Sequence, residues 1–357
     1  MATIHFAEKH MQRLMKGFDA ASLTDGLINH EVDMEFSGVK TVHVKSILTT
    51  PLQRYDATRD IDTGSRYGKT VEVSDDEQVF EMRDKISLSL TIDKTNNVDQ
   101  FEMKKAGEVM NAYKEEQIVP YLDKYRMDMW SNDAGMHYGL TAEPTLDTIA
   151  QTIIKARNAQ RNRRVSGNAA LLIPYEYLDV LSLSNQWVKL EKLGTQVLTK
   201  GTMGRFYGMD VVPFINELMP GNAWFMIMGK KAAIAPKKIN SFKGHVNPPR
   251  INGDLLEFLM YHDAFVLGKK ADDILVASMN DNVAPVPTIS VEGNNATITA
   301  AGSTIYYTVN GADPRYSVDA RTYTGPVALT AGDQLRAYAA ADGKYNSDVA
   351  KYNHPNT

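Results

Sequence analysis

The chain has 357 residues, of which 43% are hydrophobic and 23% charged, and its formal net charge is −4 at pH 7. This balance is typical of a folded globular protein and excludes wholesale disorder, and it provides no overall attraction to nucleic acid or anionic lipid. Cysteine is absent, which excludes disulfides, thiolate nucleophiles and thiolate metal sites. No segment is apolar enough for a signal peptide or a membrane span, so we expect a protein that folds in a cytosol.

A polar, charged stretch at 53–78 lies between two strand-like segments, 41–48 and 85–93. This pattern predicts a long two-stranded excursion with little core of its own, which a neighbouring subunit would receive. A disordered loop is the alternative. The charges of the excursion alternate in sign, so we expect ion pairs with neighbouring subunits from Arg54, Arg59, Asp60, Asp62, Arg66 and Lys69.

Residues 97–131 predict one long helix, because apolar side chains recur at helical spacing. Asn97 is a suitable N-cap, with Gln100 at the third helical position. Pro120 is expected to kink the helix beyond its middle. A helix of this length would measure about 50 Å, which favours an extended protein around it.

The region after the long helix mixes helices and strands. Residues 145–162 predict an amphipathic helix, 168–174 a buried strand, and 248–278 two further strands. Regular β-α-β alternation is missing, which indicates an α+β fold.

Five cations lie close together at the end of the predicted helix 145–162 and just after it: Lys155, Arg157, Arg161, Arg163 and Arg164. They could contact phosphates of a nucleic acid. Ion pairing between subunits, or simple solubility, is the interpretation that we favour.

The sequence shows no arrangement of side chains typical of catalysis. Eight histidines are present, and none pair at metal-ligand spacing. His262 and Asp263 are adjacent, but neighbouring residues of a strand face opposite ways, which favours a structural role. We therefore predict no enzyme activity, no catalytic or metal site and no cofactor.

The composition changes at residue 284, because every Met, Phe and Trp lies before it. Pro285 and Pro287 predict a short stiff linker, followed by short β-rich runs separated by turn signals. The pattern predicts a self-contained β-sandwich at 284–357. Its predicted core consists of Ile305, Tyr307, Val309, Val327 and Leu335.

The C-terminal segment resembles the C-terminal domain of chitobiases and β-hexosaminidases and the related fibronectin-III-associated modules. The matching residues are Tyr307-Thr308, Gly311, Asp313-Pro314, Tyr323, Gly325-Pro326, Ala337 and Ala339. The resemblance implies an immunoglobulin-like accessory domain without catalytic residues. We expect it to project outward from the rest of the protein, so that a chain ending at Asp281 still assembles normally. Two roles are open for this domain: a passive decoration, or weak glycan adhesion through four exposed side chains, Tyr306, Arg315, Tyr316 and Tyr323.

Residues 1 to about 282 resemble the major capsid protein of tailed double-stranded-DNA phages, whose fold herpesvirus floor domains share. The segment at 115–130 is similar to the second half of the spine helix of that family, and 232–276 to its closing segment. The resemblance implies an α+β capsid shell fold in residues 1–283. Its parts would be an N-terminal arm at 1–45, an extended loop at about 50–82, a spine helix at about 97–131, an axial domain at about 140–244 and closing peripheral strands at 245–282.

The same resemblance implies a structural protein of the virion that assembles in the host cytoplasm. It would form hexamers and pentamers of an icosahedral head around double-stranded DNA, with weak non-specific DNA contacts. A separate scaffolding protein and a portal are implied partners, because the arm and loop leave no room for a fused scaffold. The alternative is a carbohydrate-binding or adhesion protein whose N-terminal domain has another fold.

Overall fold

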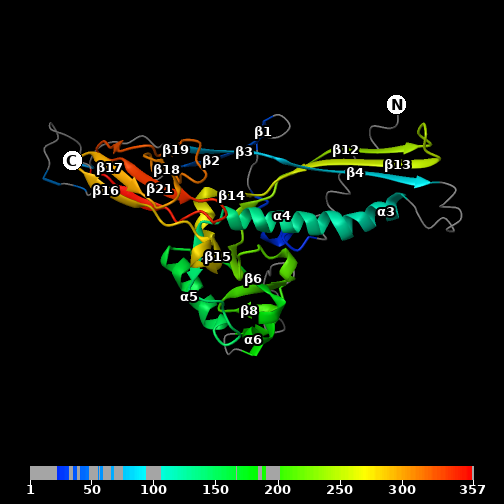
Figure 1. The fold of residues 1–357 in the computed structure, drawn as a ribbon, viewed down its shortest axis with the longest axis horizontal. Coiled ribbons are helices and arrows are strands. Elements are labelled where there is room, and N and C mark those ends of the chain that lie inside the picture. Colours follow the sequence, from blue (N-terminus) through cyan, green and yellow to red (C-terminus); the bar gives the residue numbers. More distant parts are fainter. Residues whose placement is uncertain are drawn as a thin grey trace.

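The computed structural model describes residues 22–31, 35–37, 41–47, 55, 57–58, 66–67, 75–93, 106–165, 167–183, 187–189 and 202–355. Figure 1 shows an elongated molecule with a β-sandwich at one end and a narrow sheet beside a long helix at the other. A broader α/β layer lies beneath the middle of the molecule. We call the described residues before 284 the body and those from 284 onward the sandwich.

The long helix predicted at 97–131 is present as one continuous helix that ends at Asn132. Its segments are α3 (Ala106–Tyr113), a π-helical turn (Lys114–Ile118) and α4 (Val119–Asn132). The predicted N-cap, Asn97, lies outside the described residues. Pro120 lies two residues after the end of the π-helical turn, in the first turn of α4. Because proline lacks a backbone N–H and crowds the carbonyl four residues earlier, widening the helix there relieves the clash.

A three-stranded antiparallel sheet runs along this helix in the order β12-β13-β4. Its strands are β12 (Lys237–Val246), β13 (Gly253–His262) and β4 (Asp84–Asp93). Residues of β4 mostly alternate between half-buried and exposed, so one face of the sheet meets the helix and the other meets solvent. Ile118 and Leu122 of the helix pack against Phe258 and Met260 of β13.

A seven-stranded mixed sheet forms the broad layer, in the order β5-β15-β10-β6-β9-β8-β7. Its strands are β5 (Met136–Leu140), β15 (Ile274–Met279), β10 (Phe225–Gly229), β6 (Ala169–Pro174), β9 (Met209–Phe214), β8 (Gly204–Phe206) and β7 (Trp187–Lys189). Leu171 and Leu172 are neighbours in β6, yet they lie in different cores on opposite faces of the sheet. One core contains Trp130 of α4, and the other contains Ile153 of α5 (Ile149–Asn162). A short helix, α6 (Leu178–Leu183), follows β6.

The closing segment divides between the two sheets. β13 belongs to the three-stranded sheet, whereas β15 lies between β5 and β10 in the seven-stranded one. The sequence prediction placed both strands in one peripheral unit at 245–282, and the observed pairing separates them. The apolar run of β15 is buried on both faces, which suits an interior strand, while β13 alternates and covers one face only.

A buried polar cluster fastens the N-terminal segment to α4. Ser22 Oγ and Thr24 Oγ1 donate hydrogen bonds to Asp123 Oδ1 at 2.5 and 2.6 Å, and the Leu23 backbone N–H donates to Oδ2 at 3.0 Å. Arg126 Nη1 donates to the same two hydroxyls at 3.0 and 2.9 Å. All four polar side chains are buried, so the charges of Asp123 and Arg126 are satisfied mainly by this cluster.

The predicted excursion is an antiparallel hairpin whose base packs on the body. It consists of β2 (Thr41–Ile47) and β3 (Asp75–Glu81), and β1 (Glu35–Ser37) pairs with the outer edge of β2. Val42 and Val44 pack with Phe265, and the Phe80 ring stacks on the Phe265 ring with centroids 4.4 Å apart. β2 and β3 thus pair as antiparallel strands, while most of the excursion predicted at 53–78 lies outside the described residues and stays a prediction.

The sandwich has two antiparallel sheets around one core. One sheet contains β16 (Thr288–Glu292), β17 (Asn295–Thr299) and β20 (Val327–Ala328). The other contains β19 (Arg321–Thr322), β18 (Thr304–Thr308), β21 (Gln334–Ala340) and β22 (Ala350–Asn353). All five predicted core residues lie in or against this core: Ile305, Tyr307, Val309, Val327 and Leu335.

Candidate functional site

The extended hairpin presents two exposed tyrosines beyond its paired strands. Tyr55 is 56% exposed and Tyr67 81% exposed, and their rings meet edge to face with centroids 5.1 Å apart. This pair was not predicted from the sequence, where only the charges of the segment pointed to a function. The signal was present, because Tyr55 and Tyr67 are the only aromatic residues between 48 and 74.

Most of the predicted assembly residues lie outside the described part of the chain. Arg66, beside Tyr67, is described and half-buried. The other five are Arg54, Arg59, Asp60, Asp62 and Lys69. Their ion pairs with neighbouring subunits stay a prediction.

The root of the hairpin, where β3 turns into β4, is held on the long helix by polar contacts. The buried carboxylate of Asp263 accepts hydrogen bonds from Tyr125 Oη and from the Arg83 backbone N–H, each at 3.0 Å. His262 points elsewhere, with its Nε2 2.9 Å from Asp84 Oδ2. Burial lowers the pKa of His262 and raises that of Tyr125. The two adjacent residues thus accept or share polar contacts with different groups, although both also contact Tyr125.

The basic cluster around the end of α5 is largely used within the subunit. Arg157 is buried, Arg161 lies on an aromatic ring, and Arg163 forms ion pairs. Their partners are Gln160 and the Gly167 carbonyl for Arg157, Tyr207 for Arg161, and Asp272 and Asp348 for Arg163. Contacts inside one chain therefore engage three of the five cations, while Lys155 and Arg164 are exposed. Ion pairing between subunits, or simple solubility, stays a prediction for the cluster.

The sandwich docks on the loop that follows α4, at residues 133–135. Arg315 Nη1 donates to the carbonyl oxygen of Gly135 at 3.0 Å, and its guanidinium pairs with Asp313 at 2.7 Å. Tyr316 Oη donates to the carbonyl oxygen of Asp133. The loop is also packed closely against the rest of the body, because a Cβ added to Gly135 would lie 2.1 Å from the backbone of Ala271.

Docking overturns the prediction that Arg315 and Tyr316 are exposed sugar contacts. The Arg315 side chain is only 5% exposed, and Tyr316 packs against the hydrophobic core of the body. Burial raises the pKa of Tyr316 well above its ordinary value. A turn residue is exposed to solvent only if no other part of the protein covers the turn. The body covers the turn that contains Arg315 and Tyr316.

Tyr345 joins the sandwich to the body through both its backbone and its ring. Its backbone N–H donates to the Asn282 carbonyl at 2.8 Å, and its carbonyl accepts from the Ala284 N–H at 2.9 Å. The ring is 6% exposed and stacks on His137, with centroids 4.9 Å apart. Burial lowers the pKa of His137 to about 4, so the imidazole is neutral at pH 7. The sandwich therefore has its own core, as predicted, and in addition packs against the body.

The remaining two predicted glycan contacts differ from each other. Tyr323 Oη accepts a hydrogen bond from the Ile298 N–H at 3.1 Å, which ties the two sheets of the sandwich together. Tyr306 stacks on Tyr338 across β18 and β21, with centroids 5.3 Å apart and both residues half-buried. Tyr323 thus has a structural role, while the pair of Tyr306 and Tyr338 forms a partly exposed aromatic surface.

The described ranges offer no candidate for metal chemistry. Within them, no group of three or more His, Asp or Glu side chains is placed to hold a metal ion. Among the helices that the structure describes, none combines the length and the apolarity needed to cross a membrane. Two surfaces stand out among the described residues: the hairpin with its tyrosines and the junction between body and sandwich.

Comparison with known proteins gives matches to both units. Residues 296–352 match the family described as Fn3 associated. A chain from the structure of Mycobacterium phage Che8 superposes with a TM-score of 0.50 at 16% identity, over 67% of this chain and 84% of that one. A chain in the capsid structure of the cyanophage P-SCSP1u superposes with a TM-score of 0.51 at 11% identity, over 68% and 84%. No curated protein matches the sequence.

At these identities the likeness concerns the fold. The superposed share corresponds in length to most of the body, which contains the long helix, the narrow sheet, the seven-stranded layer and the extended hairpin. The alternative of another fold in the N-terminal domain is thereby excluded. The chain has the α+β fold of phage capsid proteins, followed by a C-terminal all-β module of the fibronectin-III-associated kind.

Proposed function

We propose that this protein is the major capsid protein of a tailed phage, which assembles into an icosahedral head around double-stranded DNA. Hexamers and pentamers of the chain would form the head in the host cytoplasm and remain in the virion. A separate scaffolding protein and a portal are the proposed partners of assembly. The capsid fold supports this proposal, and the protein would have a structural role without enzymatic activity.

The observation that carries the proposal is the extended hairpin. Its base packs in a small core around Phe265, while Tyr55 and Tyr67, which lie between the paired strands in sequence, are mostly exposed. A two-stranded hairpin is marginally stable alone, and aromatic side chains are enriched among the residues that dominate protein interfaces. The hairpin is therefore suited to reach a neighbouring subunit, with the two tyrosines as anchors.

We expect Tyr67→Ser to prevent or strongly reduce shell formation while leaving a folded, soluble subunit, because the ring contributes to the interface and not to the core of its own chain. Deletion of residues 56–76 should abolish shell formation completely and also leave a folded, soluble subunit. The measurement is negative-stain microscopy and light scattering of the chain co-expressed with the scaffolding protein.

Val318→Ser is the matched control, because Val318 is 57% exposed on the sandwich and lies far from the hairpin in sequence. It should assemble as the wild type does. Normal shells from the Tyr67→Ser variant and from the deletion would show that the hairpin is only a surface loop. A stable monomer of the wild-type chain, even with its scaffold, would contradict the proposal as a whole.

Contact with DNA is proposed to be weak and non-specific. Three of the five clustered cations have partners within the subunit, and Lys155 and Arg164 are exposed. A shell with mild net negative charge needs few phosphate contacts, because strong ones would oppose release of the genome. Loss of packaged DNA length in a Lys155→Gln, Arg164→Gln double variant would argue for a stronger contact than we propose.

Weak glycan adhesion by the assembled particle is a second proposed role, supported by the stacked pair of Tyr306 and Tyr338. Aromatic faces suit the apolar faces of sugar rings, and many copies make a weak contact effective. We expect Tyr306→Ser particles to lose retention on a mucin-coated surface, whereas Thr304→Ser particles, altered at an exposed neighbour, should be retained. Equal retention of the two variant particles would show that the sandwich does not mediate glycan adhesion.

A further inference from the structure

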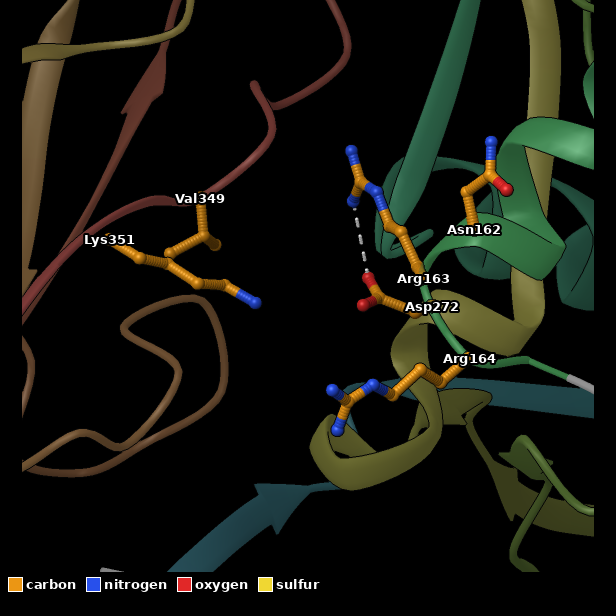
Figure 2. A pocket seen from close by; sticks show the side chains of 6 residues that line it. All are labelled: Asn162, Arg163, Arg164, Asp272, Val349 and Lys351. Carbon is orange, nitrogen blue, oxygen red and sulfur yellow. Dashed lines mark hydrogen bonds and ion pairs between the residues drawn. The ribbon is translucent and has the colours of Figure 1, made fainter. Parts of the chain in front are cut away.

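An open cleft of about 360 Å³ lies at the junction between the body and the sandwich. Figure 2 shows its two sides: residues from the end of α5 and from the turn before β15 face a strand of the sandwich. The lining residues are Asn162, Arg163, Arg164, Asp272, Val349 and Lys351. Small-molecule sites often occur at domain interfaces and measure roughly 300–1,000 Å³, so the cleft has the size of a ligand site.

The cleft has an excess of positive charge that its own residues do not neutralise. Arg163 is paired with two carboxylates, Asp272 at 3.4 Å and Asp348, so its charge is compensated and one net positive charge remains when Arg164 and Lys351 are counted. Arg164 and Lys351 are exposed, and the structure describes no hydrogen bond or ion pair of either side chain. Both point into the cleft, one from the body and one from the sandwich (Figure 2).

Two like charges that face each other from separately folded units disfavour the docked arrangement. The rest of the junction holds the units together through Arg315, Tyr316 and Tyr345, so the repulsion is tolerated. An anion placed between the two cations would turn this repulsion into attraction on both sides.

We propose that this cleft binds an oxyanion, namely the carboxylate, sulfate or phosphate group of a small ligand, between Arg164 of the body and Lys351 of the sandwich. The planar guanidinium suits two-pronged contact with an oxyanion, and the ammonium adds a point charge from the other side. The amide of Asn162 on the same wall supplies a further hydrogen-bond donor. A bound ligand would bridge the two units and strengthen their docking.

The test uses the unassembled full-length chain, with inorganic phosphate and glucuronate as charged probes and glucose as an uncharged one. Chloride keeps the ionic strength constant in every titration. We expect saturable binding of phosphate, glucuronate or both by calorimetry, together with a rise in the unfolding temperature, because a ligand that binds only the folded state stabilises it. Glucose should have neither effect.

Arg164→Gln and Lys351→Met are each expected to weaken binding by at least about tenfold, the usual effect of losing one charge-assisted hydrogen bond. Lys155→Gln is the matched control, because Lys155 is an exposed cation of α5 that does not line the cleft. All three changes are at exposed positions, so unfolding temperatures in chloride alone will verify folding. Absence of binding by either charged probe, or equal weakening by Lys155→Gln, would overturn the proposal. Phosphate binding alone, or glucuronate binding alone, would identify which oxyanion the cleft accepts.

Discussion

Ending the chain at Asp281 is expected to yield a body that unfolds at a lower temperature and is largely insoluble. Tyr316 and Tyr345 belong to the sandwich in sequence but pack against the hydrophobic core of the body. Removing two large aromatic side chains from a buried surface costs about 3–6 kcal/mol, since each contributes roughly 1.5–3 kcal/mol. That loss is a large part of the ~5–15 kcal/mol that stabilises a typical domain. The truncation therefore tests the docked arrangement, and it reverses the expectation from sequence that such a chain forms normal shells.

Two full-length variants separate docking from the mere presence of the sandwich. Tyr316→Ala removes a docking side chain, and Tyr306→Ala removes a tyrosine that stacks within the sandwich. Tyr316→Ala should clearly lower the unfolding temperature of the body, and Tyr306→Ala should lower it much less. A truncated chain with an unchanged unfolding temperature and shells of normal size would show that the sandwich is a passive addition.

Asp123→Ala is expected to destabilise the body by about 3–5 kcal/mol, the usual cost of removing one partner from a buried ion pair. Asp123 accepts three hydrogen bonds from the N-terminal segment, and its loss leaves the buried Arg126 without a counter-charge. The segment from Ser22 onward should then detach from α4. Chemical denaturation measures the loss of stability, and limited proteolysis detects the released segment.

Asp128→Ala is the control on the same helix. Asp128 pairs with Lys124 at 2.9 Å, but both side chains are more than a third exposed, and such surface pairs contribute about 0–1 kcal/mol. The control should therefore resemble the wild type in both measurements. Equal behaviour of the two variants would mean that the buried cluster does not anchor the N-terminal segment.

Local patterns in the sequence were sufficient to predict the elements whose residues mostly contact residues nearby in the chain. The sandwich core was predicted residue by residue, because alternation along short strands decides which side chains face inward. The long helix and the disruption at Pro120 followed from helical spacing and from the missing proline N–H. The order of these elements also carried the resemblance to the capsid fold, which the structure confirms.

The tertiary structure alone decided how these units meet. Arg315 and Tyr316 lie in a polar turn that predicts exposure, and only the neighbouring loop at 133–135 makes them buried. The exposed pair of Tyr55 and Tyr67 likewise became evident only in the structure. These residues are twelve positions apart in sequence, and their ring centroids are 5.1 Å apart. Burial depends on every surface that covers a side chain, including surfaces from distant parts of the chain. Periodicity along one segment shows only which side of that segment is apolar. The sequence therefore determined the helices, the strands and the core of the sandwich, and the tertiary structure determined how the sandwich and the body meet.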